Sequence, residues 1–110
     1  MIDDTLGKIQ SRIEKADAIK PENKAELLQL LGTLKSEISK IAETHAEQAQ
    51  SIAAFADIST HEATREEKHP ELLEHSLAGL SSSVTGFEQS HPRLVQIVNT
   101  ICNTLSNLGI

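Results

Sequence analysis

The chain has 110 residues, a single cysteine, two phenylalanines and a formal net charge of −6. The negative charge argues against non-specific binding to nucleic acid or to an anionic membrane surface, since both need clustered Lys and Arg. One cysteine excludes an internal disulfide and is typical of a reducing compartment. No run of 18 apolar residues is present to span a membrane. We therefore expect a cytoplasmic protein with an almost wholly aliphatic core.

Helical periodicity runs through the sequence, with apolar residues three and four positions apart. A first helix is predicted over residues 3–18. Pro21 is expected to open a second helix, because a proline at the first helical position loses no hydrogen bond. The apolar stripe of this second helix continues to Phe55. We therefore predict one long central helix over residues 21–56, about 50 Å in length.

Residues 57–69 are the most polar part of the chain. Ser59 and Glu62 match a capping box, which favours a short separate helix here, but continuation of the preceding helix fits the same residues. Two further helices are predicted to begin at Pro70 and Pro92, each of which follows a histidine.

Short connections favour antiparallel pairing of neighbouring helices. The apolar stripes of the first two helices meet in register when the chain folds near residue 20, and those of the last two meet when it folds near residue 91. The expected fold is all-α: two antiparallel helical hairpins that form a helical bundle with coiled-coil-like packing and one long central helix. The expected units are an N-terminal hairpin (residues 1–58), a polar linker or short helix (59–69) and a C-terminal hairpin (70–110).

Glycines within the predicted helices indicate close approach of neighbouring helices. Gly7 and Gly32 fall at the same level of the first hairpin, where two missing side chains would let the backbones come together. Gly79 and Gly86 lie seven residues apart on one face of the third helix. Because a helical glycine costs about 1 kcal/mol relative to alanine, this spacing favours a packing role.

The outer half of the long helix, beyond Ile38, has no partner in the first helix. Either the C-terminal hairpin or a second copy of the chain could cover it. Only Glu88 and Arg93 are charged between residues 76 and 110, and charge depletion is typical of interface cores. We therefore expect a non-enzymatic module that self-associates as a homodimer or larger assembly, or that binds another protein. The predicted interaction surface consists of Ile41, His45, Ile52, Phe55, Val95, Ile97 and Leu105, in which His45 is a polar residue within the apolar stripe.

A metal-binding helical bundle is the alternative function. Glu66 and His69, like Glu88 and His91, have the Glu-x-x-His spacing of di-iron bundles. Each histidine directly precedes a proline at a helix start, so we favour capping or solvent exposure and predict no metal or cofactor. Cys102 is expected to be a small buried hydrophobe, because no His or Asp is spaced to activate it.

The C-terminal part of the chain carries a family resemblance. Residues Phe87-Glu88-Gln89-Ser90-His91-Pro92-Arg93-Leu94 and Leu105-Ser106-Asn107-Leu108-Gly109-Ile110 resemble the uncharacterised bacterial family known as domain of unknown function 4404. The first half of the chain matches that family by its helix, proline-led turn and second helix. The resemblance implies a small all-helical bacterial protein and supplies no activity. It also implies a structural helix-start turn at Ser90, His91 and Pro92, in which Ser90 or His91 caps the last helix and Pro92 begins it.

Overall fold

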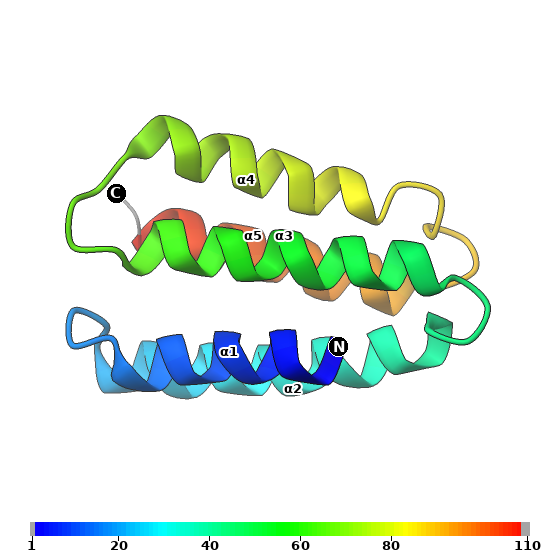
Figure 1. Ribbon diagram of the computed structural model, residues 1–110, viewed down its shortest axis with the longest axis horizontal. Coiled ribbons are helices and arrows are strands. Elements are labelled where there is room, and N and C mark those ends of the chain that lie inside the picture. Colours follow the sequence, from blue (N-terminus) through cyan, green and yellow to red (C-terminus); the bar gives the residue numbers. More distant parts are fainter. Residues whose placement is uncertain (1, 109–110) are drawn as a thin grey trace.

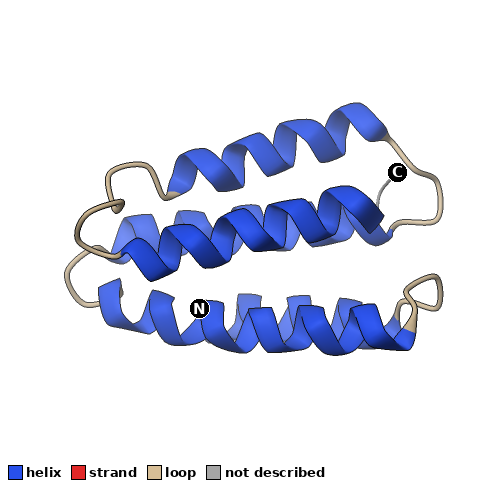
Figure 2. Ribbon diagram, turned by 180° about the vertical axis from the view of Figure 1, so that it is seen from behind, coloured by secondary structure: helices blue, strands red, loops and turns tan. Residues whose placement is uncertain are grey.

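The computed structural model describes residues 2–108, and in this part of the chain it contains five helices and no strand. The helices are α1 (Ile2–Lys15), α2 (Pro21–Ile41), α3 (Ala46–Thr64), α4 (Pro70–Ser83) and α5 (Pro92–Leu108). The predicted all-α class is confirmed. The helices lie lengthwise beside one another, with α3 and α5 between the α1–α2 pair and α4 (Figures 1 and 2). Within the described residues, none of the helices has the length and apolar character that a membrane crossing requires.

The predicted long helix over residues 21–56 is wrong, because two helices occupy this segment. α2 ends at Ile41, residues 42–45 form a turn, and α3 runs back in the opposite direction (Figure 1). In the turn, the backbone N–H of His45 donates to the carbonyl of Ile41 at 2.7 Å. A continuous helix would leave its outer half uncovered, whereas the turn lets Ile41 and Ile52 be buried completely within one chain.

The proline-led helix starts are confirmed at Pro21, Pro70 and Pro92. The helix ends agree less well with the sequence prediction. α1 ends at Lys15, three residues before the predicted end, and α4 ends at Ser83, before Gly86. Gly86 follows α4 with a φ of 101°, a left-handed conformation that favours glycine and carries the chain into the next turn. Gly86 is therefore a turn residue and not part of a helix face.

α3 continues without interruption to Thr64. Ser59 therefore lies inside α3 and does not begin a helix. For residues 57–64, the structure shows continuation of the preceding helix and not a separate short helix. α3 also runs through residue 58, where the sequence predicts the end of the first unit. The predicted division into units and the coiled-coil-like packing otherwise stay predictions. Gly109 and Ile110, part of the family-like tail, lie outside the described residues.

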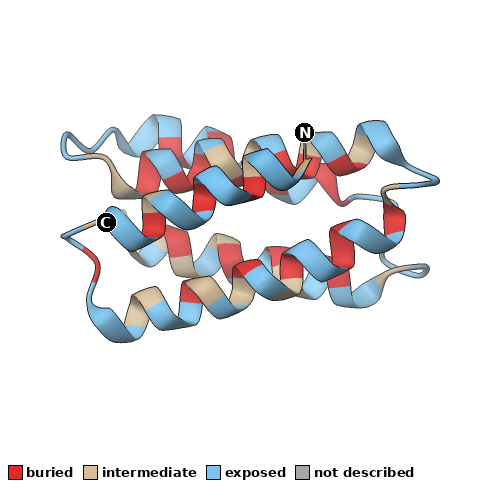
Figure 3. Cartoon of the chain, turned by 60° about the horizontal axis from the view of Figure 1, so that its bottom comes forward, coloured by how far each residue is buried: buried red, intermediate tan, exposed pale blue. Residues whose placement is uncertain are grey.

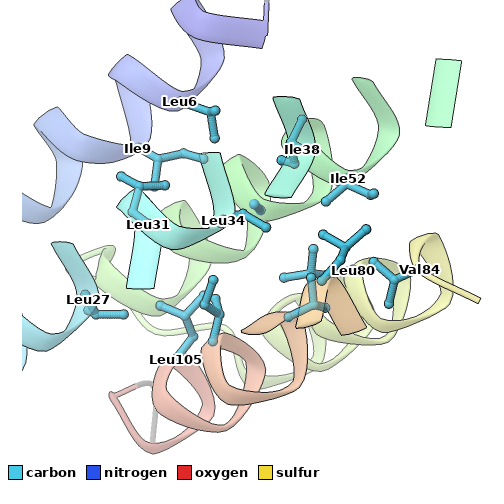
Figure 4. Close-up of a cluster of buried hydrophobic side chains, with 14 of the residues drawn as sticks. Leu6, Ile9, Leu27, Leu31, Leu34, Ile38, Ile52, Leu80, Val84 and Leu105 are labelled. Atoms are coloured by element: carbon cyan, nitrogen blue, oxygen red, sulfur yellow. The ribbon is translucent and has the colours of Figure 1, made fainter. Parts of the chain in front are cut away.

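All five helices contribute to one aliphatic core, with buried residues on the inner faces and exposed residues outside (Figure 3). α3 differs from its neighbours because its buried face consists mostly of small residues. Large aliphatic side chains from the surrounding helices fill the space beside it, as Figure 4 shows for Ile9, Leu34 and Leu80. The small buried residues of α3 are Ala49, Ala53, Ala56, Ser59, Thr60 and Ala63.

The three glycines within helices divide into one at a close contact and two beside open space. A Cβ at Gly79 would overlap the ring of Phe55, so a side chain at residue 79 would force this ring or the helix to shift. Gly7 and Gly32 have no such neighbour within 4 Å. They line a groove of about 210 Å³ between α1 and α2. The predicted close approach at Gly7 and Gly32 is therefore wrong, because the missing side chains leave an unfilled space.

Candidate interaction surface

Three residues of the predicted interaction surface belong to the core. Ile41, Ile52 and Leu105 are 0% exposed. Folding of the single chain covers them, so they cannot form a surface of the folded protein. The sequence places them in apolar stripes correctly, but the turn at residues 42–45 supplies their partners from within the same chain.

Phe55, Val95 and Ile97 are half-buried at the edges of the core. Phe55 lies over Gly79 of α4. The thiol of Cys102 donates weakly to the carbonyl of Leu77 on α4, with a sulfur–oxygen distance of 3.8 Å. Burial raises the pKa of the Cys102 thiol, which keeps it protonated and unreactive near neutral pH. These residues therefore border helix–helix contacts of the monomer.

His45 is exposed and lies outside the apolar stripe, directly before the first residue of α3. Its ring meets the buried ring of Phe87 edge to face, with centroids 5.3 Å apart. Phe87 meets the ring of His91 in the same manner at 5.6 Å. The turn between α2 and α3 is thus joined to the turn before α5 through one buried phenylalanine between two histidines.

The predicted helix-start turn at Ser90, His91 and Pro92 precedes α5 as expected. The carbonyl of His91 accepts the backbone N–H of Leu94 at 3.1 Å. The side chains of Ser90 and His91 bond to each other at 3.1 Å, not to backbone N–H groups of α5. The predicted side-chain capping by Ser90 or His91 is therefore not observed among the described residues. At the equivalent start of α4, His69 does accept the N–H of Leu72, at 3.4 Å.

The four residues of the alternative metal site lie at opposite ends of the bundle. Glu66 and His69 precede α4, whereas Glu88 and His91 follow it. A helix of 14 residues separates the two pairs by about 20 Å. Glu88 also accepts the backbone N–H of Gly86 at 2.8 Å. The four side chains cannot share one ion, and no group of three or more suitable ligands occurs within residues 2–108.

Beyond Arg93, the exposed side of α5 forms an uncharged polar surface. Residues 96, 99, 100, 103 and 107 fall within an arc of about 100° on the helix. α4 packs beside α5 and adds further small exposed residues from its second half. The side-chain amides of Asn99 and Asn103 make no hydrogen bond to the described part of the chain. We call this surface the neutral face: Ala78, Ser81, Ser82, Gln96, Asn99, Thr100, Asn103 and Asn107.

A buried carboxylate, Glu37, lies between α2 and α5 and was not predicted from the sequence. The Glu37 side chain is only 5% exposed, and its Oε2 lies 2.9 Å from Lys40 Nζ and 3.8 Å from Arg93 Nε. These groups line a polar hollow of about 430 Å³. Glu37 directly precedes the buried Ile38, and that neighbour in the apolar stripe is the signal that could have identified it.

A second polar network joins α1 to α3. Arg12 Nε donates to Asp57 Oδ1 at 3.0 Å, and Arg12 Nη1 lies 3.3 Å from Nδ1 of His61. Glu62 is buried and pairs with Arg65 at 2.9 Å. Since Arg12 and Asp57 are 45 residues apart in the chain, spacing alone did not indicate their pairing.

Comparison with known proteins gives one match. A family model described as "Domain of unknown function (DUF4404)" matches residues 27–110. No curated protein and no solved structure matches the chain. The match begins within α2 and includes all of α3, α4 and α5, together with the turn at Ser90, His91 and Pro92.

Proposed function

The chain belongs to the DUF4404 family, and from that premise we propose that it is a non-enzymatic bacterial protein-interaction module of the cytoplasm that self-associates through the neutral face. The observation that carries this proposal is the charge distribution. Residues 1–75 contain 15 acidic and nine basic residues, a net charge of −6, whereas residues 76–110 contain one of each.

Electrostatic repulsion between copies supports the choice of surface. Two copies of an acidic chain that meet through α1, α2 or the polar end of α3 bring like charges together, which opposes association. The neutral face avoids this cost, because its exposed side chains are amides, hydroxyls and one methyl group. Amides such as those of Asn99 and Asn103 donate and accept hydrogen bonds, so the same patch on two copies can pair across a two-fold axis.

Nucleophilic groups inside the bundle support a role without catalysis. The pKa of the Cys102 thiol is raised by burial, so little thiolate forms at neutral pH. The hydroxyl of Ser59 is fully buried and has no hydrogen-bond partner among the described residues, so no base activates it. Neither group has the environment of a catalytic nucleophile.

Light scattering coupled to size-exclusion chromatography tests the proposal. The unmodified chain should be dimeric at high micromolar concentration. Asn99→Glu with Asn103→Glu adds two negative charges per copy to the neutral face and should yield a monomer. The control is Gln50→Glu with Ala54→Glu, which adds the same charge at the same spacing to the exposed side of α3 and should remain dimeric. A monomeric unmodified chain, or equal dissociation of both variants, would contradict the proposal.

A further inference from the structure

The exposed side of α5 carries a stripe of polar residues within the neutral face. The stripe consists of Gln96, Thr100, Asn103 and Asn107. These residues follow one another at spacings of four, three and four, and all of them are exposed. They fall within an arc of about 60°, opposite the buried stripe that includes Leu105. Alternating spacings of four and three are the repeat by which two helices pack along a common seam.

The hydrogen-bonding groups at the centre of this polar stripe are complementary to each other. The hydroxyl of Thr100 donates to the carbonyl of Gln96 at 3.0 Å, so its oxygen is left as an acceptor. The side-chain amide of Asn103 has two N–H donors and makes no hydrogen bond to the described part of the chain. The stripe therefore presents an acceptor and a donor one helical turn apart, and they are not bonded to each other.

The neighbouring part of α4 leaves the polar stripe accessible. α4 packs beside α5, and its residues of the neutral face, Ala78, Ser81 and Ser82, are exposed and small. A second helix that approaches the stripe therefore meets short, uncharged side chains from this half of α4.

The charges near the two ends of α5 favour an antiparallel arrangement of two copies. Arg93 is the only charged residue of α5, and it lies on the side of α2, beside Glu37. Glu26 of α2 lies at the other end, where it lines a hollow with Asn107. Parallel helices would place two Arg93 side chains together and align the helix dipoles, both of which oppose association. Antiparallel helices place Arg93 of each copy at the end of α5 where the other copy has Glu26.

We propose that two copies of the chain associate by antiparallel pairing of their α5 helices along the polar stripe. This inference rests on the proposed function and adds to it which helices meet, in which direction and in which register. The alignment that uses all four stripe residues pairs Thr100 with Asn103 of the other copy, and Gln96 with Asn107. A two-fold axis at the level of residues 101 and 102 relates the copies, so each pair occurs twice. Amide and hydroxyl groups in such a seam fix the register, because a shifted alignment leaves them without partners.

Cysteine cross-linking tests the direction and the register. All variants carry Cys102→Ser; one adds Gln96→Cys and a second adds Asn107→Cys. The antiparallel pairing brings position 96 of one copy next to position 107 of the other. Two copies of the same position lie about 16 Å apart, because 11 residues of helix separate the two levels. A short bifunctional maleimide should therefore link the mixed variants and should link neither variant to itself.

Light scattering on the same samples separates this inference from the proposed function. A dimer that is linked only in the mixture is the expected result. A dimer linked within one variant alone has parallel helices, and a dimer linked in no sample lacks the α5 contact. Either result overturns the pairing without contradicting self-association, whereas a monomer contradicts both. A mixture of Gln50→Cys and His61→Cys, two exposed positions of α3 with the same spacing, is the control for random collision and should not be linked.

Removal of one hydroxyl tests the pair at the centre of the seam. Thr100→Val keeps the side-chain shape but leaves the Asn103 amide of the other copy without its acceptor. Two such pairs are lost in each dimer, so the Kd of the dimer should rise about tenfold in analytical ultracentrifugation. Thr33→Val is the control, because Thr33 of α2 also donates to the carbonyl four residues earlier and lies outside the neutral face. Its Kd should equal that of the unmodified chain, and an equal Kd for both variants would overturn the pairing.

Discussion

α1 and α5 both pack an amphipathic face on the same core, yet their surroundings differ. Leu94, Val98 and Leu105 of α5 are 0% exposed, and Arg93 lies beside the buried carboxylate of Glu37. α1 has an open groove beside it at Gly7 and Gly32, and its ion-pair partner Asp57 is 21% exposed. α5 also lies wholly within the family match, which begins at residue 27, after α1.

Equal amphipathicity of two helices therefore does not imply equal packing. α5 contacts α2, α3 and α4, whereas α1 contacts α2 and α3. Loss of α5 would expose core residues on three neighbouring helices, and loss of α1 would expose them on two. We therefore expect α5 to be an integral part of the fold and α1 to be a helix that can leave it at lower cost.

Truncation of one leucine in each helix should give the largest effects. Leu94→Ala leaves a cavity in close-packed surroundings and should lower the free energy of unfolding by about 3 kcal/mol or more. Leu6→Ala, next to the existing groove, should cost about 2 kcal/mol, at the lower end of the same range. Urea unfolding followed by circular dichroism measures both. An equal or reversed order would contradict the comparison.

Alanine at two glycines should give opposite signs. Gly79→Ala forces a Cβ into the Phe55 ring and should destabilise the protein by about 1–3 kcal/mol. Gly32→Ala has open space beside α1 and should stabilise the protein by about 0.5–1 kcal/mol through higher helix propensity. The urea concentrations at the unfolding midpoints of the two variants, each compared with that of the unmodified chain, measure both effects. Destabilisation by Gly32→Ala would mean that α1 is seated closely after all.

The ion pairs of the two helices should differ in strength. Glu37→Gln removes a nearly buried carboxylate from Lys40 and Arg93 and should cost about 1 kcal/mol. Asp57→Asn removes a carboxylate that is more exposed than Glu37, at 21% against 5%, and should cost about 0.5 kcal/mol or less. Thermal unfolding at low and high salt compares them. A larger loss for Asp57→Asn would indicate that α1 is the more firmly held helix.

Ser59→Ala should have the smallest effect, and its sign is informative. The serine hydroxyl is buried without a hydrogen-bond partner in the described residues, which is unfavourable, and alanine is the better helix former. We expect a gain of about 0.5 kcal/mol in the free energy of unfolding. A loss of stability would show that the hydroxyl has a partner in solution, such as a bound water molecule.

Proline rules predicted three helix starts from the sequence, because the chemistry of Pro21, Pro70 and Pro92 is local. The turn after Ile41 was missed because the residues at 42–45 are all compatible with a helix. What breaks the helix is long-range: Ile41 and Ile52 become buried only when the chain reverses between them. A local sequence pattern contains no information about this reversal of the chain.

The candidate surface shows the same division between local and long-range information. The depletion of charge after residue 75 was visible in the sequence, and it identifies the helices that carry the neutral face. Which residues are exposed depends on contacts between distant helices. The stripe residue Leu105 is therefore buried, whereas Asn103, two positions earlier, lies on the neutral face. The position of Glu37 beside Arg93 required the same three-dimensional information.

Native-state hydrogen exchange tests the difference between α1 and α5 most directly. We expect the backbone amides of Ile9 and Ile13 to exchange through an opening of α1 whose free energy is lower than that of global unfolding. The amides of Val98 and Ile101 in α5 should exchange only when the whole chain unfolds. Equal free energies of exchange for the two helices would show that α1 is held as firmly as α5.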